Sequence, residues 1–170
     1  MSEISGPSRV LHVVRHAKSS WKDPMLSDQD RPLKKRGRRD SKAVAVRLRE
    51  RDLTAQQIHT SPARRARETA ELINEEWGDS ATIHAAPELY HYGYHEMMMV
   101  IQSVVEPCPV LMIVGHNPTL ELLVENLAGV DITIPTAGTV SIRFPIASWT
   151  QCRAGHKVEV MDVIRPRELV

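Results

Sequence analysis

The chain has little cysteine, no long apolar run and almost no net charge. Its two cysteines, Cys108 and Cys152, are too few for a disulfide framework and lack C-x-x-C spacing, so we expect reduced thiols and a cytoplasmic protein. No segment approaches the length of a membrane span, and residues 1–8 lack the apolar core of a secretory signal. A net charge of +1, without a basic tail, is not typical of a nucleic-acid partner.

Patterns that mark bound cofactors are missing as well. Neither a P-loop nor a glycine-rich dinucleotide fingerprint occurs, so the sequence predicts no nucleotide cofactor. His91 and His95 have the i, i+4 spacing of two metal ligands, but no third ligand follows at a suitable distance. We therefore expect no metal, and we predict that residues 91–96 form a loop or lid. His12, His59, His84 and His156 have no useful neighbours, and we expect them to be structural or exposed.

What is present fits one ordinary α/β domain of 170 residues, a length that buries a core without metal or disulfide support. No repeat or linker divides it, so we predict a disordered terminus over residues 1–8 and a single domain over residues 9–170. Apolar runs predict strands at 10–14, 56–60, 82–86, 109–115, 132–134, 139–144 and 157–164. Helical periodicity predicts helices at 33–51, 62–77, 95–105 and 118–128, and a surface loop covers 19–32.

The predicted helix ends rest on local signals. Ser61 and Asn117 each precede a proline and have the side chains of good N-caps, and Gly129 is a good C-cap. Leu33 is predicted as the first apolar residue of the helix over 33–51, which Gly37 weakens locally.

Three predicted strands are followed by cationic or imidazole side chains. Arg15 and His16 follow the first strand, and His116 follows the most apolar one. Arg64 and Arg65 lie in the first turn of the helix after the second strand. The positive end of the helix dipole repels a cation there, so these arginines indicate that an anion lies between them and the helix end. An isolated Arg-His pair is usually an ordinary surface feature. Because open α/β sheets hold ligands at the carboxyl ends of their strands, the recurrence predicts an anion site there.

These residue types suit phosphoryl chemistry. Two arginines neutralise and orient a phosphate through paired N–H···O contacts, and a second histidine, when protonated, donates to another oxygen. An imidazole is nucleophilic near neutral pH, so His16 has the chemistry to accept the phosphoryl group before water hydrolyses the phosphohistidine. Arginine and histidine supply the positive charge that Mg²⁺ supplies elsewhere, so the mechanism needs no metal.

The motifs resemble a known family. Three segments resemble the signatures of the histidine phosphatase superfamily, which has the phosphoglycerate-mutase-like fold: Arg15-His16-Ala17, Ser61 to Ala66 with Thr69, and Val114 to Pro118. Further segments are similar to the small branch typified by the SixA phosphohistidine phosphatases: RHAKSSW at 15–21, DRPLKKRG at 30–37, ELY at 88–90 and PTAG at 135–138. The resemblance covers nearly the whole chain and implies a single-domain three-layer α/β/α fold with a mostly parallel central sheet.

Carried over to this sequence, the resemblance implies roles for individual residues. His16 is the implied nucleophile, and Arg15, Arg65 and His116 form the implied phosphate pocket. Arg31, by analogy with the SixA branch, adds a contact to the phosphate or the substrate.

Two further assignments depend on position. The arginine of the family's pocket immediately precedes the alanine of an Arg-Ala pair, which favours Arg65 over a solvent-facing Arg64. Many relatives use a glutamate to protonate the leaving oxygen, and Glu88 is the candidate at a comparable position, a capping carboxylate being the alternative. A phosphohistidine substrate needs this acid less, because its P–N bond is labile.

The sequence thus predicts a metal-independent phosphatase without cofactors. The short chain leaves the pocket mouth open, which favours phosphohistidine on a protein such as a phosphotransfer domain. The alternatives are a general small-molecule phosphomonoesterase and a non-catalytic module that binds phosphate or phosphoproteins. The expected partner is a phosphorylated protein or a small phosphomonoester, with no nucleic acid and no membrane.

Overall fold

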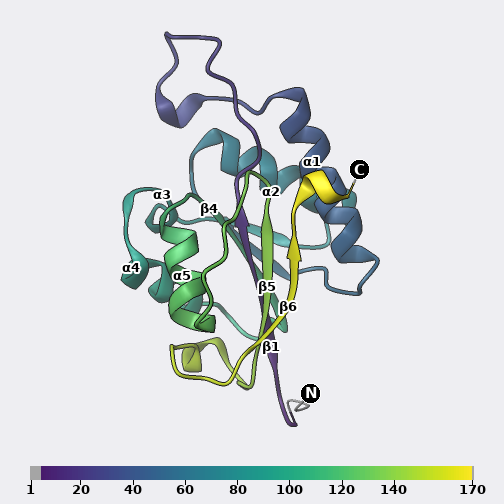
Figure 1. Ribbon diagram of the computed structural model, residues 1–170, viewed down its shortest axis with the longest axis vertical. Helices are drawn as coiled ribbons and strands as arrows, with labels where there is room; N and C mark the ends of the chain where they lie inside the picture. Colours follow the sequence, from purple (N-terminus) through teal and green to yellow (C-terminus); the bar gives the residue numbers. More distant parts are fainter. Residues whose placement is uncertain (1–4, 170) are drawn as a thin grey trace.

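The computed structural model describes residues 5–169, which are built around a six-stranded sheet (Figure 1). The strands are β1 (Arg9–Arg15), β2 (Gln57–Thr60), β3 (Thr82–Ala85), β4 (Val110–Gly115), β5 (Thr139–Phe144) and β6 (Glu159–Ile164). Their order is β3-β2-β4-β1-β5-β6, and β5 alone among these six runs in the direction opposite to the other five. The predicted mostly parallel sheet is confirmed. Part of the predicted disordered terminus, residues 1–4, lies outside the described residues.

Helices cover both faces of the sheet. One layer contains α1 (Lys35–Arg49) and α2 (Arg64–Glu76), and the other contains α3 (Glu88–His91), α4 (Tyr94–Gln102) and α5 (Thr119–Ala128). Three short 3-10 turns complete the fold: η1 (Asp28–Asp30), η2 (Trp149–Gln151) and η3 (Pro166–Glu168). The three-layer α/β/α architecture is confirmed. Within residues 5–169, no helix is both long enough and apolar enough to cross a bilayer.

The central strands β1 and β4 are mostly apolar because both of their faces are covered. In β1, Leu11 and Val13 pack into the core under α4 and α5, whereas Val10 and Val14 pack into the core under α1 and α2. His12, in the middle of β1, is also buried, and its Nε2 hydrogen-bonds the carbonyl oxygen of Leu53 at 2.8 Å.

The register of the central strands fixes where the chain leaves the sheet. Arg15 pairs with Gly115 in the parallel β1–β4 ladder, and the next backbone N–H, that of His16, donates to Gly115 O at 3.0 Å. Ser61, just after β2, donates its N–H to Val114 O at 2.9 Å. The segments that follow β1, β2 and β4 therefore start at the same edge of the sheet.

The strand predicted over 132–134 is wrong, because these residues form no ladder with the sheet. The backbone of Ile134 is bonded by side chains instead. Its N–H donates to Glu121 Oε1 at 2.8 Å, and its carbonyl oxygen accepts from Asn117 Nδ2 at 2.9 Å and from an Arg15 terminal nitrogen at 3.1 Å. Ile132 and Ile134 alternate with polar residues because both pack against the core, but the segment that contains them is a loop.

Two predicted N-caps are also wrong. The N-cap of α2 is Ala63, and Ser61 Oγ accepts from the Ala63 N–H at 3.2 Å in the turn before the helix. The N-cap of α5 is Pro118, and the Asn117 side chain bonds the loop at Ile134. Gly129 at the end of α5 has φ of 68° and is the predicted C-cap.

The helix predicted from Leu33 begins later, at Lys35. Leu33 is buried, but its backbone is extended and forms an isolated antiparallel bridge with Ser19. Its N–H donates to Glu68 Oε2 at 2.8 Å, which fixes the end of the 19–32 loop against α2.

Gly37 is needed where α1 crosses the chain that leaves β1. A Cβ at this position would lie 2.9 Å from the backbone nitrogen of Lys18 and closer still to its carbonyl oxygen. The sequence predicts only that this glycine weakens the helix, whereas the close approach explains why it is there.

A Gly37→Ala variant is expected to lower the free energy of unfolding by about 1–3 kcal/mol, since α1 or the Lys18 backbone must shift. Urea denaturation measures this change. Gly93→Ala is the matched control, because its added Cβ meets only the flexible Glu96 side chain at 3.6 Å. Equal denaturation midpoints for Gly37→Ala and the wild type would contradict the argument.

Candidate active site

The ends of β1, β2 and β4 bring together side chains that are far apart in the sequence. The rings of His16 and His116 lie 5.0 Å apart between centroids. A terminal nitrogen of Arg65, from the first turn of α2, lies 3.4 Å from His116 Nδ1. These are three of the side chains that the sequence analysis expects to converge.

His16 is buried and held as one tautomer. Its Nδ1 lies 2.8 Å from the carbonyl oxygen of Ala17, and because that oxygen only accepts, Nδ1 carries the proton. Burial, together with the cations of Arg65 and Arg15, outweighs the bond to Ala17 and lowers the pKa of His16 to about 4. The ring is therefore neutral at pH 7, and its Nε2 makes no hydrogen bond to residues 5–169.

His116 is held as the opposite tautomer. The Arg65 guanidinium only donates, so His116 Nδ1 is the acceptor and Nε2 carries the proton, which it donates to Ser61 Oγ at 2.8 Å. Burial, followed by His16 and Arg65, lowers the pKa of His116 to about 3. His116 is therefore neutral at pH 7, and the hydroxyl of Ser61 fixes its orientation.

Arg65 and Arg64 have different surroundings although they are adjacent. Arg65 is buried, and its two terminal nitrogens donate to the carbonyl oxygen of Asp28 at 2.7 Å and to Asp28 Oδ2 at 3.0 Å. Arg64 is exposed and pairs with Glu68 at 2.9 Å on the surface of α2. The choice of Arg65 for the pocket agrees with this difference in burial.

Two buried N–H donors have no partner within the described chain. They are the Nε atoms of Arg15 and Arg65. Arg15 is otherwise held by one terminal nitrogen, which donates to Ile134 O. A buried donor without a partner costs about 1–3 kcal/mol, a cost that an oxyanion between the two arginines would remove.

The 19–32 loop brings a carboxylate to the arginines. Asp28 Oδ1 accepts from Arg31 Nε at 3.1 Å, while Oδ2 accepts from Arg65 and from the Tyr90 hydroxyl at 2.8 Å. Burial raises the pKa of Asp28, but the bond from Tyr90 and the charges of Arg65 and Arg31 outweigh it and lower the pKa to about 2. Asp28 is therefore ionised and holds both arginines in place.

Arg31 is buried within this loop. One of its terminal nitrogens donates to Ser19 Oγ at 3.0 Å, and its guanidinium carbon lies 3.4 Å from the centre of the Trp21 ring. Arg31 contacts Arg65 only through Asp28. Arg31 can therefore make its expected contact with the phosphate only when its ion pair with Asp28 breaks.

Sequence reasoning missed Asp28 and Tyr90. The i, i+3 spacing of Asp28 and Arg31 in the S-D-Q-D-R segment is the one local signal of an ion pair. The link from Asp28 to Arg65 spans 37 residues and depends on the fold of an aperiodic loop.

Glu88 is half-buried at the first position of α3. No hydrogen bond or ion pair joins its carboxylate to another residue of the described range. Tyr90 of the same short helix reaches the site instead, through Asp28 and through its ring, which lies 5.4 Å from that of His116.

The structure offers no metal site in the part of the chain that it describes, because no three His, Cys, Asp or Glu side chains gather there at suitable distances. Cys108 and Cys152 are free and buried. The positive charge around His16 comes from Arg15, Arg65 and Arg31.

Comparisons with known proteins show the family of this chain and support its fold. Residues 11–107 match the model of the histidine phosphatase superfamily, branch 1. An uncharacterised chloroplastic protein of Arabidopsis thaliana is 30% identical over 86% of this chain and 72% of its own length. Two solved structures assigned as the phosphohistidine phosphatase SixA are similar. That from Nakamurella multipartitia has TM-score 0.81 and 24% identity over 95% of this chain and 98% of its own. That from Agrobacterium tumefaciens has TM-score 0.79 and 25% identity over 95% and 100%.

Proposed function

Because the chain belongs to the histidine phosphatase superfamily, we propose that it is a metal-independent phosphatase that forms a phosphohistidine intermediate on His16. We further propose that its substrate is phosphohistidine in a protein. One observation carries the proposal. Among residues 5–169, the Nε2 atom of a neutral His16 has no hydrogen bond, and the Arg15 and Arg65 side chains next to it each have an unpaired Nε–H. A nucleophile next to unsatisfied donors is what phosphoryl transfer requires.

In the first step, the Arg15 and Arg65 Nε–H groups bind phosphoryl oxygens and His16 Nε2 attacks the phosphorus. A P–N bond forms to Nε2, and the bond from phosphorus to the leaving atom breaks, with its electron pair going to that atom. The ring becomes cationic while Nδ1 keeps its proton. The Ala17 carbonyl oxygen, already 2.8 Å from Nδ1, stabilises this cation.

In the second step, water attacks the phosphorus, the electron pair of the P–N bond returns to Nε2, and phosphate leaves. The negative phosphoryl group raises the pKa of His116, so that a protonated His116 donates to a phosphoryl oxygen. Glu88 is our candidate acid for an oxygen leaving group. An imidazole leaving group has less need of it.

A protein substrate is supported by the surface around the 19–32 loop. This loop projects beyond the body of the domain at the carboxyl end of β1 (Figure 1, purple-blue). It carries Trp21, 71% exposed, and Met25, 89% exposed, on the same segment as Asp28 and Arg31. Exposed large apolar side chains next to a polar site are typical of protein contacts.

A phosphatase assay with a panel of substrates tests the proposal. We expect a phosphorylated histidine-containing phosphotransfer domain to be hydrolysed with a kcat/KM roughly tenfold or more above that of phosphoglycerate or sugar phosphates. EDTA is expected to leave all rates unchanged. A tenfold preference for a small phosphometabolite, about 1.4 kcal/mol at the transition state, would favour a general phosphomonoesterase. Phosphate binding without turnover of any substrate would favour a non-catalytic module.

The protonation of His16 provides a second test. Because burial and the nearby arginines lower its pKa to about 4, the ring is neutral, and therefore nucleophilic, at every pH above that value. An NMR titration of the free protein is expected to show the His16 ring titrating near pH 4 and the His116 ring near pH 3. A His16 midpoint near 6.5, the ordinary value, would contradict the described environment.

A further inference from the structure

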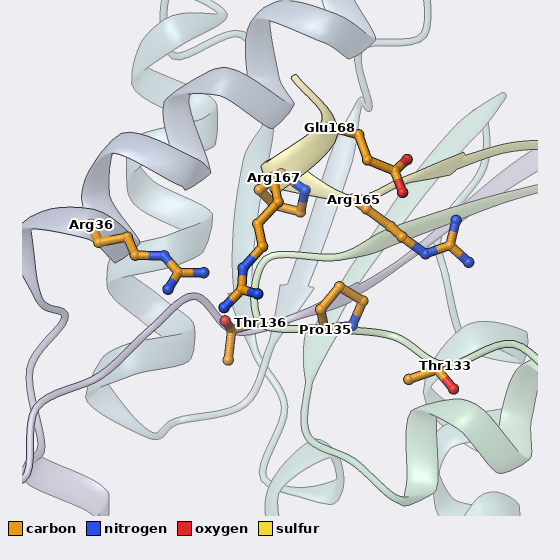
Figure 2. Close-up of a pocket in the computed structure, with 8 residues that line it drawn as sticks. Arg36, Thr133, Pro135, Thr136, Arg165, Arg167 and Glu168 are labelled. Atoms are coloured by element: carbon orange, nitrogen blue, oxygen red, sulfur yellow. The ribbon is translucent and has the colours of Figure 1, made fainter. Parts of the chain in front are cut away.

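A second pocket, with a volume of about 410 Å³, lies at the carboxyl end of β6 (Figure 2). Three arginines line it: Arg36 from the first turn of α1, Arg165 directly after β6, and Arg167 in η3. Pro166, between the last two, is buried, which anchors η3 and holds both arginines at the rim. The sequence analysis assigns none of these arginines a role.

The pocket carries a surplus of positive charge. Arg36 uses its Nε to pair with Asp40 at 3.3 Å, which leaves both terminal nitrogens without a partner in residues 5–169. Over the same residues, Arg165 and Arg167 make no ion pair, and Glu168 is the one acidic side chain that lines the pocket. Figure 2 shows the Arg36 and Arg167 guanidinium groups pointing toward Thr136, with Arg165 on the other side of Pro135. Guanidinium groups and a hydroxyl are the donors that bind an oxyanion.

The distance between this pocket and the candidate active site follows from the sheet register. Val14 of β1, Thr139 of β5 and Ile164 of β6 lie in one row across the sheet. The next residues along β1 and β6 are Arg15 and Arg165, and two strand spacings separate their backbones by about 10 Å.

One turn forms a wall between the two sites. Pro135 and Thr136 line the pocket. On the other side, the Ala137 N–H donates to the carbonyl oxygen of Arg15 at 3.0 Å, and the Arg15 N–H donates to Gly138 O at 3.1 Å. A ligand that fills the pocket is therefore held at a fixed position relative to Arg15 and His16.

We propose that this pocket binds a carboxylate side chain of the phosphoprotein substrate, which makes Arg165 and Arg167 specificity-determining residues. The inference rests on the proposed function. The turn over residues 135–138 separates the pocket from Arg15 and His16, so the phosphate and the carboxylate come from different residues of a substrate surface that spans both sites.

The test is the double variant Arg165→Gln/Arg167→Gln, which leaves the Arg36–Asp40 ion pair intact. Its matched control is Arg153→Gln/Lys157→Gln, which removes the same charge from exposed residues before β6, at the opposite end of the sheet. We expect the double variant to raise KM roughly tenfold for a phosphorylated phosphotransfer domain, with kcat unchanged. Turnover of an aryl phosphate is expected to stay at the wild-type level. The control variant should match the wild type on both substrates.

A direct binding measurement separates this inference from the proposed function. Fluorescence anisotropy of a labelled tetraglutamate peptide is expected to show binding to the wild type and to the control, and none to the double variant. Equal binding to the double variant and the wild type overturns the pocket, as does a larger KM effect on a sugar bisphosphate than on the phosphoprotein. If the wild type hydrolyses aryl phosphate but not the phosphoprotein, the proposed substrate is wrong. Peptide binding then still decides whether the pocket accepts carboxylates.

Discussion

A His16→Ala variant is expected to lose roughly 10⁴-fold or more of its phosphatase activity while keeping its fold. The substitution removes Nε2, the atom to which the phosphoryl group is transferred. The native side chain makes one hydrogen bond, to the carbonyl oxygen of the adjacent Ala17, so its removal leaves the contacts between β1, β4 and β5 in place. Single-turnover assays and thermal unfolding, measured side by side, check both halves of this expectation.

The covalent intermediate gives a second measurement on the same variant. Wild-type protein quenched during turnover should carry acid-labile phosphate, and His16→Ala should carry none. His84→Ala is the control, since His84 is exposed on the edge strand β3. Activity above a few per cent of the wild type in a folded His16→Ala variant would remove His16 as the nucleophile.

Arg65→Gln is expected to lower kcat/KM by roughly 10²–10³-fold, the usual effect of removing one donor to a transition-state oxyanion. Arg64→Gln is the matched control from the same helical turn. Because Arg64 is exposed and pairs only with Glu68, its loss should change kcat/KM by less than about twofold. Steady-state kinetics on an aryl phosphate, with inorganic phosphate as inhibitor, measures both effects.

An Arg65→Lys variant separates charge from geometry. Lysine keeps the positive charge but lacks the planar guanidinium group with its Nε–H. It therefore cannot replace the unpaired donor of Arg65. We expect at least about a tenfold loss to persist. Full activity in Arg65→Lys would mean that charge alone is required, and equal losses in the Arg64 and Arg65 variants would contradict the placement of Arg65 in the pocket.

The part of the site that lies on regular structure could be predicted from the sequence. Apolar runs mark β1 and β4 because both faces of these strands are buried, and the polar residues directly after them must then lie at one edge of the sheet. His16 and His116 can therefore be predicted from the sequence, and so can Arg65, which lies in the first turn of α2, the helix after β2. Their meeting needs only the parallel order of the strands.

Contacts made by loops could not be predicted, because they depend on tertiary partners. Ser61 and Asn117 have the side chains of N-caps, but the hydroxyl of Ser61 is bound by His116 and the amide of Asn117 by Ile134. Local preference predicts only that such a side chain seeks a partner near the helix start. The contacts of Asp28 were even less predictable, because its loop has no periodicity and its partner Arg65 is 37 residues away in the sequence.

The stacking of Arg31 on Trp21 makes Trp21 an intrinsic fluorescence probe of the site. Of the three tryptophans, Trp77 and Trp149 are buried in the core, and Trp21 alone is exposed, with a guanidinium 3.4 Å from its ring centre. Indole fluorescence responds to a cation stacked on the ring, so movement of Arg31 toward a bound phosphate changes the fluorescence of Trp21. The buried Trp77 and Trp149 contribute a constant background. Occupancy of the site is thus readable without a label, and in the His16→Ala variant it is readable without turnover.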